Sequence, residues 1–135
     1  MTKINSILRN EKVLVVDDFQ EWLNVARNNL VYYGCPLERI VTAKNIEEGF
    51  RKYKNENPTL NFIDINFNPD NLKDTQGFGL IRRLRGDNYT HPIIAMSSLT
   101  ENIRERVLDA GANFFIGKMN FVEDFDRFIE WYSQR

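Results

Sequence analysis

Side chains suited to binding a metal ion and a phosphoryl group end four short apolar segments of this chain. They are Asp17 and Asp18 after residues 12–16, Asp64 within residues 59–65, Ser97 after residues 92–96 and Lys118 after residues 113–117. Three carboxylates in one cleft would raise one another's pKa unless a cation intervened, and hard oxygen ligands with room for water suit Mg²⁺. The metal, a lysine and a hydroxyl donor together would supply the positioning and charge neutralisation that phosphoryl transfer needs, and a carboxylate can itself be the acceptor.

Asp64 is the first candidate for this chemistry because of its place in its segment. Residues 59–65 are mostly apolar, which predicts a strand buried on both faces of a parallel sheet, and the polar residues Asn66 and Asn68 follow at once. An ionised carboxylate at such a strand end is costly unless it meets water, a cation or a partner. Open α/β sheets form their sites just outside the carboxyl ends of the strands.

Five successive strand–helix units would bring these side chains together. Strands are predicted at residues 12–16, 39–43, 59–65, 92–96 and 113–117, and each is followed by a segment of helical periodicity. This alternation predicts an α/β fold, a doubly wound five-stranded parallel sheet with helices on both faces and right-handed crossovers. The carboxyl ends of parallel strands share one edge of the sheet, so the polar side chains are expected to meet there.

Pairs of residues with the spacing of capping boxes mark the starts of three predicted helices: Asn45 with Glu48, Ser98 with Glu101, and Asn120 with Glu123. Glycines in positions typical of helix ends follow two helices, at Gly34 and Gly111. Asp18, with Glu21 three residues on, has a structural interpretation as a helix cap beside its interpretation as a metal ligand.

The last predicted helix carries two distinct faces. An apolar stripe is expected to face the sheet, made of Val122, Phe125, Phe128, Ile129 and Tyr132. Asp124, Arg127 and Trp131 share another face, which is expected to be solvated. Trp131 then has two interpretations: a ring lying flat over the end of the core, or an anchor for a partner, since Trp is enriched at binding hot spots.

Composition excludes several classes of protein. The chain has 135 residues, enough for one domain with one core, and a formal net charge of −1, which gives no bulk reason to expect a nucleic acid or an anionic membrane as partner. No apolar run approaches a membrane span and no secretion signal is present, so a cytoplasmic location is expected. Cys35 is the only cysteine, which rules out a disulfide framework.

Residues 1–11 are expected to form an N-terminal extension, either a tail or a turn packed on the domain at residues 12–135, with the tail preferred.

Four segments together resemble the receiver domain of bacterial two-component response regulators, from about Glu11 to the C-terminus. They are residues 13–18 (VLVVDD), 62–66 (FIDIN), 92–98 (PIIAMSS) and 111–118 (GANFFIGK). The resemblance implies the flavodoxin-like strand order 2-1-3-4-5. It also implies that Asp64 accepts the phosphoryl group and that Asp18, Asp64 and the backbone carbonyl of Asn66 bind Mg²⁺.

The resemblance assigns the other strand-end residues as well. Asp17 would hold a metal-bound water, Lys118 would pair with the phosphoryl oxygens and Ser97 would hydrogen-bond to them. Phe115 would be the aromatic residue that repacks behind Ser97 when the domain switches.

Three features depart from the family pattern. The polar segment 66–76 is long for a strand-to-helix connection. Met119 stands where the family usually has a proline joined to the lysine by a cis bond; a cis bond before a residue other than proline costs ~3–4 kcal/mol, so the bond is either trans or strained. Leu99 cannot hydrogen-bond to an attacking water, which predicts slow loss of the phosphoryl group.

Other functions fit the sequence less well. A flavodoxin-like cofactor binder needs phosphate-binding donors after the first strand, where Asp17 and Asp18 would repel a phosphate. A haloacid-dehalogenase-like phosphatase needs a second aspartate as general acid where Asn66 stands. A phosphorylation-independent pseudo-receiver that acts as a protein-interaction module is the remaining alternative, although every charged member of the site is present.

The sequence therefore predicts a stand-alone, chemotaxis-receiver-like phosphoacceptor, not an enzyme acting on other substrates. Its phosphoryl donor would be a histidine kinase or a histidine phosphotransfer protein. Output would come from a downstream protein or from self-association through the last two helices and the fifth strand, or through an effector outside this sequence. Neither direct nucleic-acid binding nor membrane insertion is expected.

Overall fold

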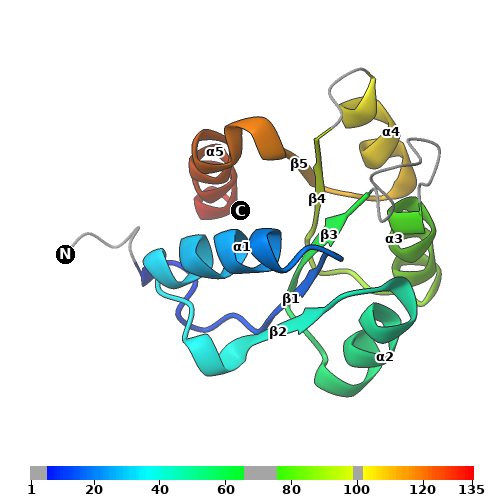
Figure 1. Ribbon diagram of the computed structural model, residues 1–135, viewed down its shortest axis with the longest axis horizontal. Helices are drawn as coiled ribbons and strands as arrows, with labels where there is room; N and C mark the ends of the chain where they lie inside the picture. The colour runs from blue at the N-terminus through cyan, green and yellow to red at the C-terminus, as the bar shows by residue number, and fades with distance from the viewer. Residues whose placement is uncertain (1–5, 66–75, 99–101) are drawn as a thin grey trace.

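The computed structural model describes residues 6–65, 76–98 and 102–135, and strands and helices alternate along them (Figure 1). The strands are β1 (Val13–Val16), β2 (Ile40–Ala43), β3 (Leu60–Asp64), β4 (Ile93–Ser97) and β5 (Phe114–Gly117). The α-helices are α1 (Gln20–Tyr32), α2 (Ile46–Glu56), α3 (Gln76–Gly86), α4 (Ile103–Ala110) and α5 (Phe121–Ser133). Two 3₁₀ turns, η2 (Leu37–Arg39) and η3 (Lys118–Asn120), precede β2 and α5.

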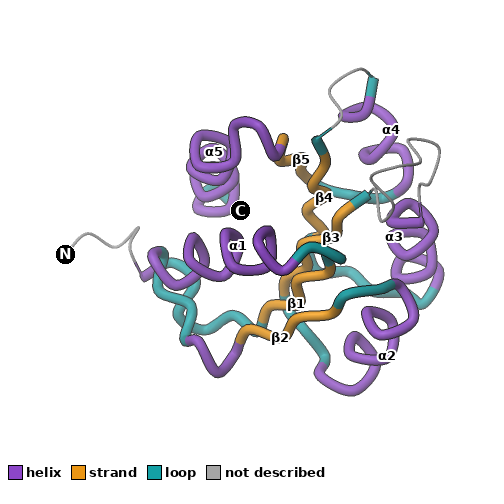
Figure 2. Tube along the Cα trace, in the orientation of Figure 1, coloured by secondary structure: helices purple, strands orange, loops and turns teal. Residues whose placement is uncertain are grey.

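The strands form one parallel sheet in the order β2-β1-β3-β4-β5, which confirms the predicted fold (Figure 2). Val16 lies opposite Ile63, the residue before Asp64, and Ser97 lies opposite Gly117, the residue before Lys118. This register brings the carboxyl ends of β1, β3, β4 and β5 to one edge, so the polar residues that follow or end these strands lie together.

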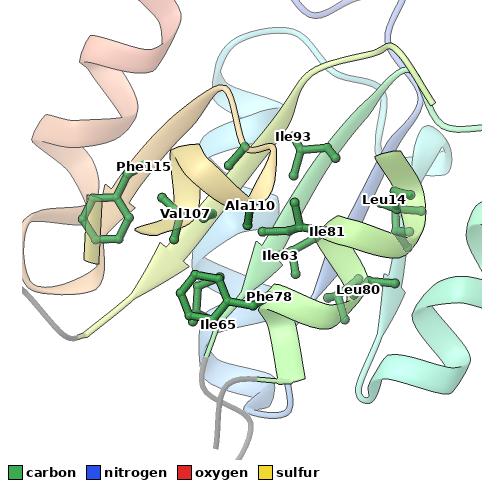
Figure 3. Close-up of a cluster of buried hydrophobic side chains, with 14 of the residues drawn as sticks. Leu14, Ile63, Ile65, Phe78, Leu80, Ile81, Ile93, Val107, Ala110 and Phe115 are labelled. Atoms are coloured by element: carbon green, nitrogen blue, oxygen red, sulfur yellow. The ribbon is translucent and has the colours of Figure 1, made fainter. Parts of the chain in front are cut away.

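Helices cover both faces of the sheet. In Figure 1, α1 and α5 lie on one side and α2, α3 and α4 on the other. Alternate residues of β1 point to opposite sides: Val13 and Val15 pack with α1 and α5, whereas Leu14 and Val16 pack with α2, α3 and α4. Figure 3 shows the second cluster, in which side chains of α3 and α4 pack on β3 and β4. Burial on both faces explains why the strands are apolar throughout rather than alternating.

The predicted helix ends are confirmed in part. Asn45 caps α2, its side-chain oxygen accepting a hydrogen bond from the Glu48 N–H at 2.8 Å. Asn120 is the N-cap residue of α5, but its side chain makes no capping hydrogen bond. Helix α4 begins later than the pair of Ser98 and Glu101 predicts; its N-cap residue is Asn102, and Glu101 lies outside the described residues.

The buried residues of the helix α5 differ in part from the predicted ones. Val122 is 58% exposed, and its predicted burial is wrong, whereas Phe121 is buried. Phe121, Phe125 and Phe128 are buried, and Val122 is rotated about 100° from Phe121 in the first turn of α5. Asp124 shares the inward side and is buried, so its predicted exposure is also wrong.

Residues 6–11 pack on the domain rather than forming a free tail. Leu8 is fully buried, and its N–H donates to the Tyr33 carbonyl at 3.0 Å. Of the two alternatives for the N-terminal segment, the packed turn describes these residues; residues 1–5 lie outside the described part.

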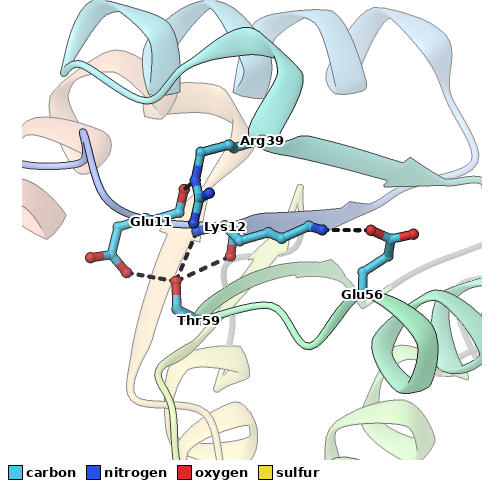
Figure 4. A network of polar contacts seen from close by, with 5 residues as sticks. All are labelled: Glu11, Lys12, Arg39, Glu56 and Thr59. Carbon is cyan, nitrogen blue, oxygen red and sulfur yellow. Dashed lines mark hydrogen bonds and ion pairs between the residues drawn. The ribbon is translucent and has the colours of Figure 1, made fainter.

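Polar contacts close the amino edge of the sheet, opposite the predicted site (Figure 4). The Lys12 N–H donates to the Thr59 hydroxyl at 2.9 Å, which donates to the Glu11 carboxylate at 2.8 Å. Arg39 Nε donates to the Glu11 carbonyl at 3.0 Å, and Lys12 Nζ pairs with Glu56 at 2.6 Å. These contacts hold the starts of β1, β2 and β3 together.

Within the described ranges, no helix is both long enough and apolar enough to cross a membrane.

Candidate metal and phosphoacceptor site

Three carboxylates meet at the carboxyl edge of the sheet, as the sequence predicts. Asp17 and Asp18 follow β1, Asp64 ends the neighbouring β3, and one oxygen atom from each lies within 4.8 Å of the others. Asp17 and Asp64 are buried, whereas Asp18 is partly exposed. Carboxylate oxygens gathered at this spacing form a candidate metal site that opens toward solvent at Asp18.

The Lys118 ammonium group lies between two of these carboxylates. Its Nζ atom is 2.8 Å from Asp17 Oδ2 and 3.1 Å from Asp64 Oδ1, and its side chain is only 5% exposed. A buried ammonium group needs this pairing, because water does not compensate its charge there. Lys118 is therefore held within the site and does not extend into solvent.

Asp17 is fixed by the backbone on both sides. Its N–H donates to the Ala43 carbonyl at 3.0 Å, and its Oδ1 atom accepts a hydrogen bond from the Phe19 N–H at 3.0 Å. The N-cap position of α1 belongs to Phe19, whose side chain makes no capping hydrogen bond, so the alternative of Asp18 as a helix cap is wrong.

Negative charge exceeds positive charge in this site, and the pKa values reflect it. Burial, followed by the charge of Asp17, raises the pKa of Asp64 to about 7, although the charge of Lys118 opposes the rise. Burial and the charge of Asp17 also raise the pKa of Asp18 above its ordinary value. One lysine does not balance three carboxylates, and a bound cation would lower both pKa values.

Two oxygen atoms show that the residues fit a divalent cation. Within the described part of the chain, Asp18 Oδ1 and Asp64 Oδ2 are buried and accept no hydrogen bond. Buried carboxylate oxygens normally have partners, and a hard cation with its own water ligands would provide one for both. Asn66, the third expected metal ligand, lies outside the described residues, as do Leu99 and most of the segment 66–76.

Ser97 and Phe115 occupy neighbouring strands beside this cluster. Ser97 ends β4 and is buried, and Met96 before it lies opposite Asp64. Phe115 is 7% exposed and packs on the side of the sheet covered by α4, where the Arg104 guanidinium group lies 5.9 Å from its ring centroid. The structure places both at the predicted positions, and their switching roles stay predictions.

The turn after Lys118 shows how the chain accommodates Met119. The Lys118–Met119 bond is trans, as are the other described peptide bonds, and Met119 is 77% exposed within the turn η3. Asp124 accepts a hydrogen bond from the Gly117 N–H at 2.9 Å and thereby fixes the residue before Lys118. Sequence reasoning missed this role; a carboxylate in the first turn of α5, next to the inward Phe125, was the available signal.

Gly77 is a second residue that sequence reasoning missed. It lies at the start of α3, where its N–H donates to the Ile65 carbonyl at 3.2 Å. A Cβ atom at Gly77 would lie 2.2 Å from the Asp64 carbonyl oxygen and 2.6 Å from Ile65 Cα. Only glycine therefore lets α3 approach the end of β3 this closely.

Comparison with known proteins identifies the class. A family model described as the response regulator receiver domain matches residues 13–129. The chain belongs to this family, as its strand-end residues indicate.

Individual relatives agree with this assignment. The alkaline phosphatase synthesis transcriptional regulatory protein PhoP of Bacillus subtilis is 27% identical over 110 residues, 81% of this chain and 42% of that protein. A probable transcriptional regulator, ycf27, of Pyropia yezoensis is 29% identical over 112 residues, 82% of this chain and 42% of that protein. The chain thus spans about 42% of the length of these curated relatives.

Solved structures share the fold. The receiver domain of NtrX from Brucella abortus superimposes with a TM-score of 0.74 at 22% identity, covering 90% of this chain and 98% of that one. The beryllofluoride-activated N-terminal receiver domain of RstA from Klebsiella pneumoniae gives a TM-score of 0.73 at 21% identity, covering 91% and 98%. These similarities confirm the flavodoxin-like arrangement.

Proposed function

We propose that this chain is a phosphoacceptor in a two-component or phosphorelay system and that Asp64 receives the phosphoryl group. The observation that carries the proposal is the position of Lys118, buried within 2.8 Å of Asp17 and 3.1 Å of Asp64 while one oxygen of Asp64 has no hydrogen-bond partner in the described part of the chain. The donor would be a histidine kinase or a histidine phosphotransfer protein, in the cytoplasm.

In the proposed step an oxygen of the ionised Asp64 carboxylate forms a bond to phosphorus. The bond from phosphorus to the donor nitrogen breaks, and its electron pair leaves with the donor. Lys118 would then pair with a phosphoryl oxygen and Ser97 would donate a hydrogen bond to another. Loss of the group follows when water attacks phosphorus and the Asp64 carboxylate leaves. This chemistry is confined to the chain's own aspartate.

Asp17, Asp18 and Asp64, with the Asn66 carbonyl, would hold a Mg²⁺ ion in this site. Bound there, the ion would neutralise charge on the phosphoryl oxygens. Asp17 is already oriented by the Phe19 N–H, which leaves its other oxygen to pair with Lys118.

Intact-mass measurement after incubation with acetyl phosphate tests this proposal. With Mg²⁺ the wild-type chain should gain one phosphoryl group, and with EDTA it should gain none. Asp64→Asn should abolish the adduct, Asp18→Asn should reduce it, and Asp109→Asn, an exposed aspartate on α4, should leave it unchanged. A full adduct on the Asp64→Asn variant would overturn the assignment.

The same measurement decides the alternative of a phosphorylation-independent pseudo-receiver. The exposed Met119 in a trans bond after Lys118 is the observation that favours it. A wild-type chain that binds Mg²⁺ but gains no phosphoryl group, from acetyl phosphate or from a phosphorylated donor protein, would establish it.

Output is proposed to run through protein contacts on the surface of α4, β5 and α5, either with a downstream protein or with a second copy of the chain. Trp131 is partly buried on α5, with its ring 5.7 Å from Phe114 and 6.1 Å from Phe128. This packing supports the interpretation of Trp131 as a ring lying over the end of the core, so the surface would act without Trp131 as its main anchor.

A further inference from the structure

The Lys118 ammonium group has a third neighbour besides the two carboxylates. Trp22, in the first turn of α1, presents its ring with the centroid 5.1 Å from Lys118 Nζ. The helices α1 and α5 lie on the same side of the sheet (Figure 1), and the Trp22 ring packs against Phe121, the first residue of α5, at 5.8 Å. Trp22 therefore connects the site to the packing between these two helices.

The burial of Lys118 makes this contact important. An ammonium group that is 5% exposed has lost most of its water, and the ion pairs with Asp17 and Asp64 occupy only part of its surface. The face of an aromatic ring is negative and attracts a cation, most strongly for Trp and more strongly when the cation is desolvated. The indole ring thus replaces part of the lost hydration.

Packing also fixes the Trp22 ring itself. Phe121 contacts Trp22 at an interplanar angle of 31°, and Phe125 stacks on Phe121 with the ring centroids 5.9 Å apart. Phe125 is fully buried in the core between the sheet and α5. A ring supported in this way holds the cation in a defined place, which a flexible side chain would not do.

We propose that Trp22 is a positioning residue for Lys118, holding its ammonium group in the carboxylate cluster and directed toward Asp64. Trp22 acts through Lys118 and does not itself touch the reacting atoms. This inference rests on the proposed function for its consequence, because Lys118 is the residue expected to pair with the phosphoryl group. The contact itself does not depend on phosphorylation and is measurable separately.

The first test measures the contact in the absence of metal and phosphoryl mimic. In the ¹H–¹³C spectrum of the wild-type chain, the ε-methylene protons of Lys118 should be shifted upfield by the indole ring. Trp22→Phe should keep part of the shift and Trp22→Leu should remove it, whereas Trp131→Leu should leave it unchanged. An unshifted Lys118 signal in the wild type, or a shift that survives in Trp22→Leu, would overturn the proposal.

The second test measures the affinity for beryllofluoride at saturating Mg²⁺ by calorimetry. Trp22→Leu should weaken this affinity by on the order of tenfold, equivalent to about 1.4 kcal/mol, with Trp22→Phe in between. The affinity for Mg²⁺ alone should change less than about twofold, because Lys118 does not bind the ion.

A double-mutant cycle separates positioning from a general loss of structure. In a Lys118→Met background, Trp22→Leu should have no further effect on beryllofluoride affinity. A tenfold loss that persists in that background would overturn the proposal. If the wild-type chain binds no beryllofluoride, the proposed function fails, and the Lys118 spectrum still decides whether Trp22 holds the lysine.

Discussion

Two glycines of α3, only two residues apart, are expected to respond in opposite ways to the same substitution. At Gly77 an added Cβ atom would lie 2.2 Å from the Asp64 carbonyl oxygen, whereas at Gly79 it would meet no atom of the described residues within 4 Å beyond its chain neighbours and its own helix backbone. Gly77 is buried and Gly79 is exposed. The pair therefore compares the same chemical change with and without the contact at the candidate site.

The expected change in the free energy of unfolding follows from the surroundings of each glycine. Gly79→Ala should raise the free energy of unfolding by about 0.5–1 kcal/mol, because alanine is the better helix former and meets no clash. For a chain of this size that corresponds to a rise in Tm of roughly 2–4 °C. Gly77→Ala gains the same propensity, but its Cβ atom meets two backbone atoms inside 3.0 Å, so β3 or α3 must move. Overpacking of this kind costs about 1–3 kcal/mol, and a net loss is expected.

Urea unfolding of the two variants checks the stability effect, and acetyl phosphate labelling checks the site. Gly77→Ala should reduce labelling of Asp64, because the carbonyl that must move belongs to Asp64 itself, whereas Gly79→Ala should label like the wild type. Equal stability changes for the two variants would show that α3 does not approach β3 as closely as described. Unchanged labelling in an unstable Gly77→Ala variant would show that the strand end tolerates the shift.

Three further predictions concern the polar side chains of Asp64, Tyr89 and Arg85. Burial raises the pKa of Asp64 from 3.8 to about 7, so between these pH values the folded chain retains a proton that the unfolded chain has lost. The free energy of unfolding of the metal-free protein should therefore fall as pH rises from about 4 to about 7. Urea unfolding of Asp64→Asn at the same pH values should lack this decrease. Tyr89→Phe should cost about 1–3 kcal/mol in urea unfolding, because it leaves the buried amide of Asn61 without its partner, and adding Asn61→Leu should recover part of that loss. Arg85→Lys should lower the free energy of unfolding by about 2 kcal/mol. The reason is that Arg85 donates to three carbonyl groups and one side-chain oxygen, which a lysine does not reach together. The control Arg82→Lys, at an exposed position, should change it by less than about 0.5 kcal/mol. A free energy of unfolding that does not change with pH would refute the first argument. A double variant of Tyr89→Phe and Asn61→Leu no more stable than Tyr89→Phe would refute the second, and equal losses of stability in Arg85→Lys and Arg82→Lys would refute the third.

The sequence was sufficient to predict the carboxylates and the lysine of the site because their positions follow from strand ends. A parallel sheet aligns the carboxyl ends of its strands, so Asp17, Asp64 and Lys118 meet whatever the side-chain details are. The same periodicity predicted the order of elements and most of the core. Val122 was misplaced because its spacing matches that of Phe125 and Ile129, whereas in the first turn of α5 the adjacent Phe121 takes the buried position.

Residues that position the site were not predictable in the same way. The partners of Trp22, Gly77 and Asp124 are distant in sequence or belong to the backbone, and no local pattern encodes them. Arg85 is a further example, because it holds the loops before β4 and β5 to the end of α3. Such contacts depend on how closely two elements approach, which is decided by packing across the whole domain.

The charges of the site explain why a cation and a phosphoryl group would depend on each other. With Asp17, Asp18 and Asp64 ionised and Lys118 protonated, three negative charges and one positive charge leave a net charge of −2. Phosphorylation replaces the Asp64 charge with a group carrying about −1.5 to −2, so the net charge would become about −2.5 to −3. A divalent cation would bring it to about −0.5 to −1. The same excess of negative charge binds Lys118 tightly to Asp17 and Asp64 in the absence of the ion, so the lysine becomes available to a phosphoryl oxygen only when other positive charge takes over part of its role. Labelling that proceeds equally with and without Mg²⁺ would contradict this account.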